Sequence, residues 1–343
     1  MTATAIDTPL VEVQNAVMEY PASSGFGGGR QVVHAVSDVS MSLARGRTVG
    51  LVGESGCGKT TLGRLVVGLE RPTSGVIKFD GVDVRAGTRE QRRRARRELQ
   101  LMFQDPYASL DPRMKVGAII GEPLAVQRRG TRAERKDRVA QLLTEVGLPT
   151  SMISRHPHEF SGGQRQRIGL ARALALSPQV IVADEPVSAL DVSVRSQILN
   201  LMMDLQQAHQ LTYLIISHDL TTLRYIADQV GVMYLGQLVE WGPSDVLFKE
   251  TVHPYTRALI DTIPTPDPVR ERAKTTIQVR GELPSAIDPP SGCRFRTRCP
   301  RAQQLCADVQ PPLAYFGPGH QAACHFPLRE PVPTALSLTH AKE

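Results

Sequence analysis

Residues 53 to 60 read Gly53-Glu54-Ser55-Gly56-Cys57-Gly58-Lys59-Thr60, which matches glycine, any four residues and then Gly-Lys-Thr. The apolar run Thr48–Val52 before this stretch predicts a buried strand, and the spacing of Thr61–Val67 after it predicts a helix. Glycines at such a strand-to-helix turn let backbone amides point at phosphate oxygens, beside the positive end of the helix. We therefore expect Lys59 to reach the β- and γ-phosphates of a nucleotide and Thr60 to place its hydroxyl on Mg²⁺.

The composition is that of a soluble globular protein with about two domains: 343 residues, 41% hydrophobic and 22% charged. No apolar run reaches the ~18 residues needed to span a bilayer, and the start lacks a secretion signal. We therefore expect a cytosolic protein that meets a membrane only through partners. The densest basic run, Arg92–Arg97, lies between Glu90 and Glu98 without aromatic residues, which favours a solvated helix face over nucleic-acid binding.

Strands and helices alternate after a β-rich beginning, which indicates an α/β fold. Strands are expected at 10–17, 32–43, 48–52, 76–81, 101–104, 180–185 and 211–216, and helices within 116–148, 168–176 and 193–209. The predicted regions are a flexible N-terminus at 1–9, a nucleotide-binding domain at 10–260 with a helical subdomain at about 105–175, a small extension at 261–330 with four Cys, and a disordered tail at 331–343.

Two carboxylates follow the buried run Val180–Ala183, at the expected carboxyl edge of a parallel sheet. Asp184 is placed to hold Mg²⁺ together with Thr60, and Glu185 to orient or deprotonate an attacking water. His218 follows the next predicted strand, where it could hydrogen-bond the γ-phosphate. A structural role is the simpler interpretation of a lone histidine, but the order of the motifs favours the site.

A second anion-binding stretch, Ser161-Gly162-Gly163-Gln164, stands at the start of a predicted helix. There a hydroxyl, an unobstructed backbone and the helix dipole act together. An ordinary N-cap is the alternative interpretation of Ser161. Because the chain already has one phosphate loop, the second stretch requires another nucleotide.

These motifs, in this order, resemble the nucleotide-binding subunits of ATP-binding cassette (ABC) transporters over residues 10–260. The resemblance implies a P-loop ATPase with an N-terminal antiparallel β portion, a parallel-sheet core and an inserted helical subdomain. It also implies that two subunits pair head to tail, so that each completes the other's site. The implied catalytic residues are Lys59, Gln104, Glu185 and His218, and the implied Mg²⁺ ligands are Thr60, Gln104 and Asp184.

The resemblance further implies a set of ATP contacts. Tyr20 would stack on adenine, although packing at a strand end is the alternative. Cys57 is either a small filler within the loop or a reactive thiol. The remaining implied contacts are Gly53, Ser55, Gly56, Gly58, Lys59, Thr60 and Thr61 in the loop, and Ser161, Gly162, Gly163, Gln164 and Asp191 near the shared interface.

Two longer segments, Phe103–Arg113 and His156–Arg167, resemble the dipeptide/oligopeptide importer branch of this family, and Tyr107 with Gln164 suggests its second, F-type ATPase subunit. The implied partners are a sister ATPase subunit, two transmembrane permease subunits and an external solute-binding protein, at the cytoplasmic face of the cell membrane, with no nucleic acid. Import of another small solute, such as a nickel chelate, is one alternative, and a nucleic-acid-linked cassette ATPase is another.

Four of the five cysteines lie in the extension, at Cys293, Cys299, Cys306 and Cys324. In a cytosolic chain such clustering favours metal or redox chemistry over disulfides. Four thiolates satisfy a [4Fe-4S] cluster or a tetrahedral zinc, but the short Cys pairs usual for zinc are lacking. The extension resembles that of importer-branch members, some of which carry an iron–sulfur cluster there. A cluster is therefore the leading expectation. Zinc, unmetallated thiols and disulfides are the alternatives, with a structural clip as the expected role.

Overall fold

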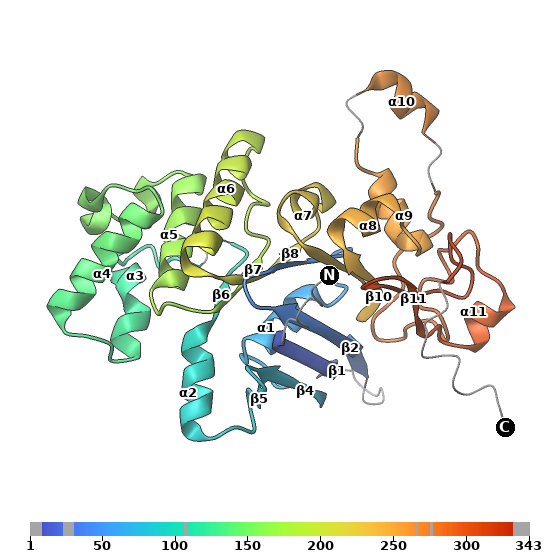
Figure 1. The fold of residues 1–343 in the computed structure, drawn as a ribbon, viewed down its shortest axis with the longest axis horizontal. Coiled ribbons are helices and arrows are strands. Elements are labelled where there is room, and N and C mark those ends of the chain that lie inside the picture. Colours follow the sequence, from blue (N-terminus) through green and yellow to red (C-terminus); the bar gives the residue numbers. More distant parts are fainter. Residues whose placement is uncertain (1–8, 23–30, 106–108, 265–266, 275–276, 332–343) are drawn as a thin grey trace, which may run out of the picture.

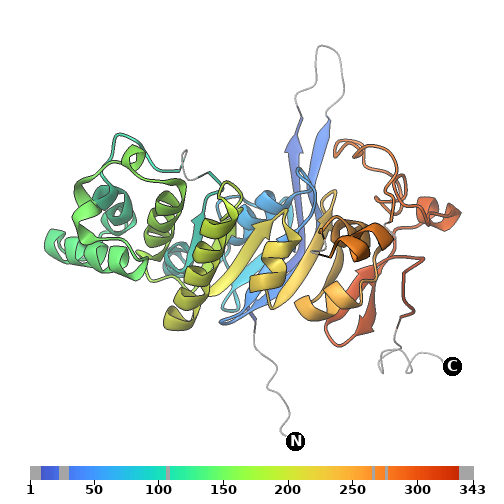
Figure 2. The same cartoon turned by 90° about the horizontal axis from the view of Figure 1, so that it is seen from above.

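The structure is a computed structural model that describes residues 9–22, 31–105, 109–264, 267–274 and 277–331. A helical lobe, a central region of sheets and the C-terminal extension lie in a row (Figures 1 and 2). Most of the predicted flexible N-terminus, most of the predicted disordered tail and Tyr107 lie outside the described residues.

A mixed eight-stranded sheet forms the centre, in the order β11-β12-β10-β9-β3-β8-β7-β6. Its central strands run parallel to one another. They are β6 (Leu99–Met102), β7 (Val180–Asp184), β8 (Thr212–Ser217), β3 (Thr48–Val52) and β9 (Gln229–Tyr234). β10 (Gln237–Pro243) returns antiparallel to β9. The carboxyl ends of the parallel strands therefore meet at one edge, as the sequence predicts.

Successive residues of the central strands enter two different hydrophobic cores. In β8, Tyr213 and Ile215 belong to the larger core, whereas Leu214 and Ile216 belong to the smaller one. Side chains alternate across a strand, so this arrangement buries both faces of the sheet. It explains why these strands occur in the sequence as uninterrupted apolar runs.

An antiparallel sheet in the order β2-β1-β4-β5 forms the N-terminal β portion, as predicted. Its strands are β1 (Pro9–Pro21), β2 (Val32–Ala44), β4 (Ser74–Phe79) and β5 (Val82–Asp83). This sheet and α1 (Lys59–Val66) share the smaller core. α2 (Arg89–Glu98) carries the basic run, and Ala95 is its only buried residue, so the expected solvated helix is present.

The helical lobe follows β6 and contains α3 (Val116–Val126), α4 (Arg132–Glu145), the short 3₁₀ helices η1 (Thr150–Ser154) and η2 (Pro157–Glu159), and α5 (Gly162–Leu174). The larger core continues into this lobe through residues such as Val139 and Leu142. The helices after β7 are α6 (Val192–His209), α7 (Leu220–Ile226), α8 (Ser244–Lys249) and α9 (Pro254–Asp261). Within the described ranges, no helix has the length and apolar character needed to cross a membrane.

The extension contains α10 (Pro268–Ala273), α11 (Gln304–Asp308), β11 (Leu313–Gly317) and β12 (His320–Ala323). β12 pairs antiparallel with β10, so the extension lengthens the central sheet. Phe295 is 1% exposed and belongs to the larger core. The predicted boundary near residue 260 therefore falls at the end of α9, where the extension and the cassette share packing.

Candidate nucleotide and catalytic site

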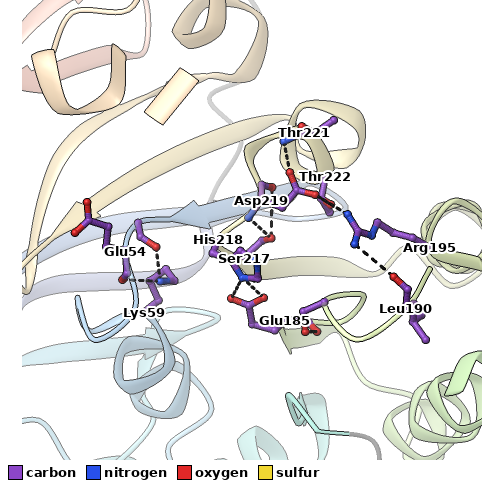
Figure 3. Close-up of polar contacts among 12 residues, drawn as sticks. Glu54, Lys59, Glu185, Leu190, Arg195, Ser217, His218, Asp219, Thr221 and Thr222 are labelled. Carbon is purple, nitrogen blue, oxygen red and sulfur yellow. Dashed lines mark hydrogen bonds and ion pairs between the residues drawn. The ribbon is translucent and has the colours of Figure 1, made fainter. Parts of the chain in front are cut away.

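The phosphate loop lies between β3 and α1, in the strand–turn–helix context that its sequence predicts. Lys59 is the first residue of α1, and its side chain turns back over the loop. The Lys59 ammonium donates hydrogen bonds to the carbonyl oxygens of Gly53 at 2.6 Å and Glu54 at 3.0 Å (Figure 3). Backbone carbonyl groups of the phosphate loop therefore hold the positive charge of Lys59 in place.

The glycines of the phosphate loop are required for different structural reasons. A Cβ on Gly53 would lie 2.2 Å from the carbonyl oxygen of Met233, and a Cβ on Gly58 would lie 2.0 Å from that of Ala35. Gly56 has a φ of +79°, and nothing lies within 4 Å of its Cβ position, which is open space. A backbone with close support on one side and open space on the other fits a phosphate group.

Asp184 ends β7 and is 5% exposed. Burial raises its carboxyl pKa, the charge of Glu185 adds to this, and a hydrogen bond with Thr60 opposes it. Among the described residues, the Oδ1 atom of Asp184 has no hydrogen-bond partner. A buried carboxylate oxygen without a partner, next to a threonine hydroxyl, fits a Mg²⁺ ion.

Glu185 leaves β7 with a φ of +51°, which is strained for a residue with a side chain. Its N–H donates to the carbonyl oxygen of Ile216 at 2.8 Å, which holds this turn against β8. Its carboxylate is 8% exposed and lies 2.8 Å, measured at Oε1, from Nδ1 of His218 (Figure 3). An ionised carboxylate only accepts, so Nδ1 carries the hydrogen. The sequence does not predict this contact, because the two residues follow different strands.

Gln104 lies just beyond β6 and is exposed. The register pairs Met102 of β6 with Ala183 of β7, so Gln104 follows the same sheet edge that Asp184 and Glu185 follow. The structure therefore brings Gln104 to the edge that the sequence predicts, while its role stays a prediction.

Tyr20 lies at the end of β1, and its hydroxyl donates to the carboxylate of Glu70. Burial, followed by this hydrogen bond, raises the pKa of Tyr20, whereas a hydrogen bond with Thr61 lowers it. These contacts place Tyr20 beside α1, and adenine stacking stays a prediction. Cys57 is 1% exposed, and burial raises its thiol pKa, which favours the filler interpretation over a reactive thiol.

Ser161 is the N-cap of α5: its hydroxyl accepts from the Gln164 N–H at 3.4 Å, and the Gln164 side chain accepts from the Ser161 N–H at 3.0 Å. Ser161 therefore caps α5 and is exposed, and its contact with a nucleotide stays a prediction. A Cβ on Gly163 would lie 2.5 Å from Val194, so this glycine permits close packing on α6. α5 lies in the helical lobe, whereas the phosphate loop adjoins α1 in the central region (Figure 1).

Asp191 caps α6 by accepting from the Val194 N–H at 2.8 Å, a bond that lowers the pKa of Asp191. An unpredicted ion pair lies nearby. Arg195 of α6 donates to Asp219 at 3.0 Å and to the carbonyl oxygen of Leu190 at 3.4 Å (Figure 3). It ties the loop after β7 to the residue that follows His218.

The four cysteines of the extension are free thiols, as is Cys57. The N–H of Cys293 donates to the carbonyl oxygen of Cys306 at 2.8 Å. Burial, with smaller contributions from neighbouring thiols, raises the pKa of Cys293 to about 11 and that of Cys324 to about 12. In the described part of the chain, no three or more His, Cys, Asp or Glu side chains are arranged to hold a metal ion. The arrangement therefore does not support the expected cluster or zinc site.

Fold and site together define a P-loop nucleotide-binding cassette. Residues 36–188 match the family described as ABC transporter, and residues 239–306 match the one described as oligopeptide/dipeptide transporter, C-terminal region. A Brucella ovis relative is 52% identical over 319 residues, which cover 93% of this chain and 98% of the relative. The "Di/tripeptide transport ATP-binding protein DppF" of Pseudomonas aeruginosa is 46% identical over 318 residues, covering 92% and 97%. The chain belongs to the ABC transporter family and, within it, to the oligopeptide/dipeptide transporter branch.

Solved structures agree with this fold. One is titled as a dimeric, post-hydrolysis state of the ATP-binding cassette MJ0796 bound to ADP and Pi. It has a TM-score of 0.60 and 26% identity, and the match covers 68% of this chain and 98% of that one. Another, cbiO1 of Clostridium perfringens, has a TM-score of 0.60 and 27% identity, covering 71% and 91%. Both cover less of this chain than the sequence relatives do.

Proposed function

We propose that this chain is the ATP-hydrolysing subunit of an ABC transporter that imports di- or oligopeptides. The observation that carries the proposal is the contact of Glu185 with His218, at the sheet edge where the phosphate loop also begins. Hydrolysis of ATP needs a fixed γ-phosphate and a polarised water, and this edge offers groups for both. The peptide substrate is supported by the match of residues 239–306 and by the relative DppF, which is named as a di/tripeptide transport protein.

Each side chain has a chemically distinct part in the proposed reaction. Lys59 and the loop amides bind the β- and γ-phosphates. Glu185 orients the attacking water and accepts its proton, and burial keeps this carboxylate from free exchange with bulk solvent. His218 donates from Nδ1 to Glu185, and an imidazole with hydrogens on both ring nitrogens can also donate from Nε2 to the γ-phosphate. Thr60, Asp184 and Gln104 would hold Mg²⁺, which neutralises phosphate charge when bound.

A second copy of the cassette completes the site in this proposal. Ser161 is exposed at the start of α5, and the helix start offers backbone N–H groups and a positive dipole to an anion outside its own subunit. The solved structure of MJ0796, which is described as dimeric, supports such a pair. We infer a sister ATPase subunit, two permease subunits and an external solute-binding protein as partners, with this chain held at the cytoplasmic face of the membrane.

We also propose that the four cysteines of the extension bind a [4Fe-4S] cluster, after a local adjustment of their side chains. The number and sequence spacing of the four cysteines support this assignment, while burial, which raises the pKa of Cys293 and Cys324, opposes the thiolate form that a cluster needs. Iron and sulfide analysis of anaerobically purified protein tests it. Stoichiometric iron and sulfide that disappear in a Cys293→Ser/Cys299→Ser protein would support the cluster, whereas metal-free wild-type protein would contradict it.

Co-purification tests the proposed transporter. A tagged form of this chain, expressed in its native cell and extracted in detergent, should bring down two polytopic membrane subunits. The assembled complex should hydrolyse ATP faster when a peptide-loaded binding protein is added. Salt-sensitive recovery with nucleic acid, or recovery with no membrane subunit, would contradict the proposal.

A further inference from the structure

Glu54, in the phosphate loop, is held at three groups: its N–H, its carbonyl oxygen and its carboxylate. Its N–H donates to the hydroxyl of Tyr255 at 3.0 Å, its carbonyl oxygen accepts from Lys59, and its carboxylate contacts Arg298. Tyr255 belongs to α9 and Arg298 to the extension. Two of the three contacts therefore reach the loop from the C-terminal part of the chain.

The ion pair between Glu54 and Arg298 is largely enclosed. Nη1 of Arg298 lies 2.8 Å from Oε2 and 3.0 Å from Oε1 of Glu54, and the side chains are 12% and 30% exposed for Arg298 and Glu54. The guanidinium also lies over the ring of Tyr234, with Cζ 5.9 Å from the ring centroid. Enclosure reduces screening by water and salt, so this pair is stronger than an ordinary surface pair.

The turn that carries Arg298 is itself fixed. The Arg298 N–H donates to the carbonyl oxygen of Phe295 at 3.0 Å, and the Arg298 carbonyl oxygen accepts from the Arg280 N–H at 3.1 Å. Phe295 packs edge-on against Tyr234, with ring centroids 5.2 Å apart, and is tilted against Tyr255 at 5.3 Å. The extension therefore delivers Arg298 to the loop on an ordered aromatic support.

A carboxylate inside a phosphate-binding loop is unfavourable unless it is neutralised, because it repels the triphosphate. The Glu54 carboxylate points away from the Lys59 ammonium (Figure 3) and toward Arg298. We propose that Arg298 is a positioning residue of the nucleotide site, which neutralises Glu54 and holds its carboxylate away from the phosphates. The inference rests on the proposed ATP-binding function of this loop, and it makes nucleotide affinity depend on the C-terminal extension.

Calorimetric titration of the full-length chain with Mg²⁺–ATP at low salt tests the inference. Arg298→Gln should weaken ATP binding about 10-fold, because the Glu54 carboxylate is then unpaired. Arg298→Lys should stay within about 3-fold of wild type, since it keeps the charge. The double change Glu54→Gln/Arg298→Gln should recover most of the loss, which a merely structural arginine would not do. Arg301→Gln is the matched control, because Arg301 donates to the carbonyl oxygens of Phe326 and Pro327.

Glu54→Asp is a second test of the ion pair, which can be used if the Arg298→Gln protein does not fold. The shorter side chain withdraws from Arg298 but keeps its charge, so ATP binding should weaken several-fold. Wild-type ATP affinity in the Arg298→Gln or Glu54→Asp protein would overturn this inference and leave the proposed function intact. A double variant that binds ATP no better than Arg298→Gln would do the same. A wild-type chain that does not bind ATP would contradict the proposed function and, with it, this inference.

Discussion

Replacement of Glu240 by Gln tests how the extension is joined to the cassette. Glu240 lies in β10 and is completely buried. Its carboxylate accepts from the N–H groups of Val252 and His253, both at 2.9 Å, and lies 2.9 Å from Nε2 of His320 in β12. A glutamine keeps the shape, but its NH₂ cannot accept, so at least one buried donor loses its partner. Hydrogen bonds to a charged group contribute ~1.5–3 kcal/mol each, and we expect Glu240→Gln to lower the free energy of unfolding by ~2–4 kcal/mol.

Urea unfolding followed by tryptophan fluorescence measures this loss. Trp241 is the single tryptophan, adjoins Glu240 in β10 and pairs with Gln321 in β12, so it reports this junction directly. Glu250→Gln is the matched control, because Glu250 pairs with Arg329 at the surface and its side chain is 49% exposed. The control should lose less than ~1 kcal/mol. A Glu240→Gln protein that unfolds no earlier than the control would refute the reasoning.

Two further predictions concern His253 and the glycines Gly58 and Gly81. Burial lowers the pKa of His253 from 6.5 to about 4, so between these values the unfolded chain binds a proton that the folded chain does not. The free energy of unfolding should therefore fall by about 3 kcal/mol as the pH decreases through this interval. Urea unfolding midpoints measured at several pH values should fall less for His253→Asn than for wild type. Midpoints that fall equally with pH in the two proteins would contradict this. Gly58→Ala should abolish ATP binding, because the new Cβ would meet the Ala35 carbonyl oxygen. Gly81 has a similar positive φ, but the space around its Cβ position is open. Gly81→Ala should therefore lower the stability by only about 1 kcal/mol and leave ATP affinity unchanged. Equal ATP affinities of the two glycine variants would show that the close contact does not matter.

Most of the cassette could be predicted because its signals are local. The phosphate loop, the strand that ends in Asp184 and the cap at Ser161 each lie within a few consecutive residues, and the structure places each in the predicted element. The hairpin of β9 and β10 was not predicted. Leu235 and Gly236 form its turn with φ values of 42° and 79°, and the glycine was a usable signal for a two-residue hairpin.

The contacts that join distant parts of the chain could not be predicted in the same way. Glu54 and Arg298 are 244 positions apart, and Glu185 and His218 meet only because β7 and β8 are neighbours. The cysteine pattern likewise shows how many possible metal ligands the extension has, but it does not determine where the thiols point. Sequence patterns thus give the residue types of the site, while its electrostatic partners depend on the tertiary fold.

Hydrolysis by a Glu185→Gln protein tests the central claim most directly. The change keeps the size of the side chain and removes its capacity to take a proton from water. With Glu250→Gln as a control, both variants should bind Mg²⁺–ATP as tightly as wild type, and only Glu185→Gln should lower phosphate release in the assembled complex, by about 100-fold or more. Phosphate release at the wild-type rate in the Glu185→Gln complex would contradict the assignment of this carboxylate and the mechanism built on it.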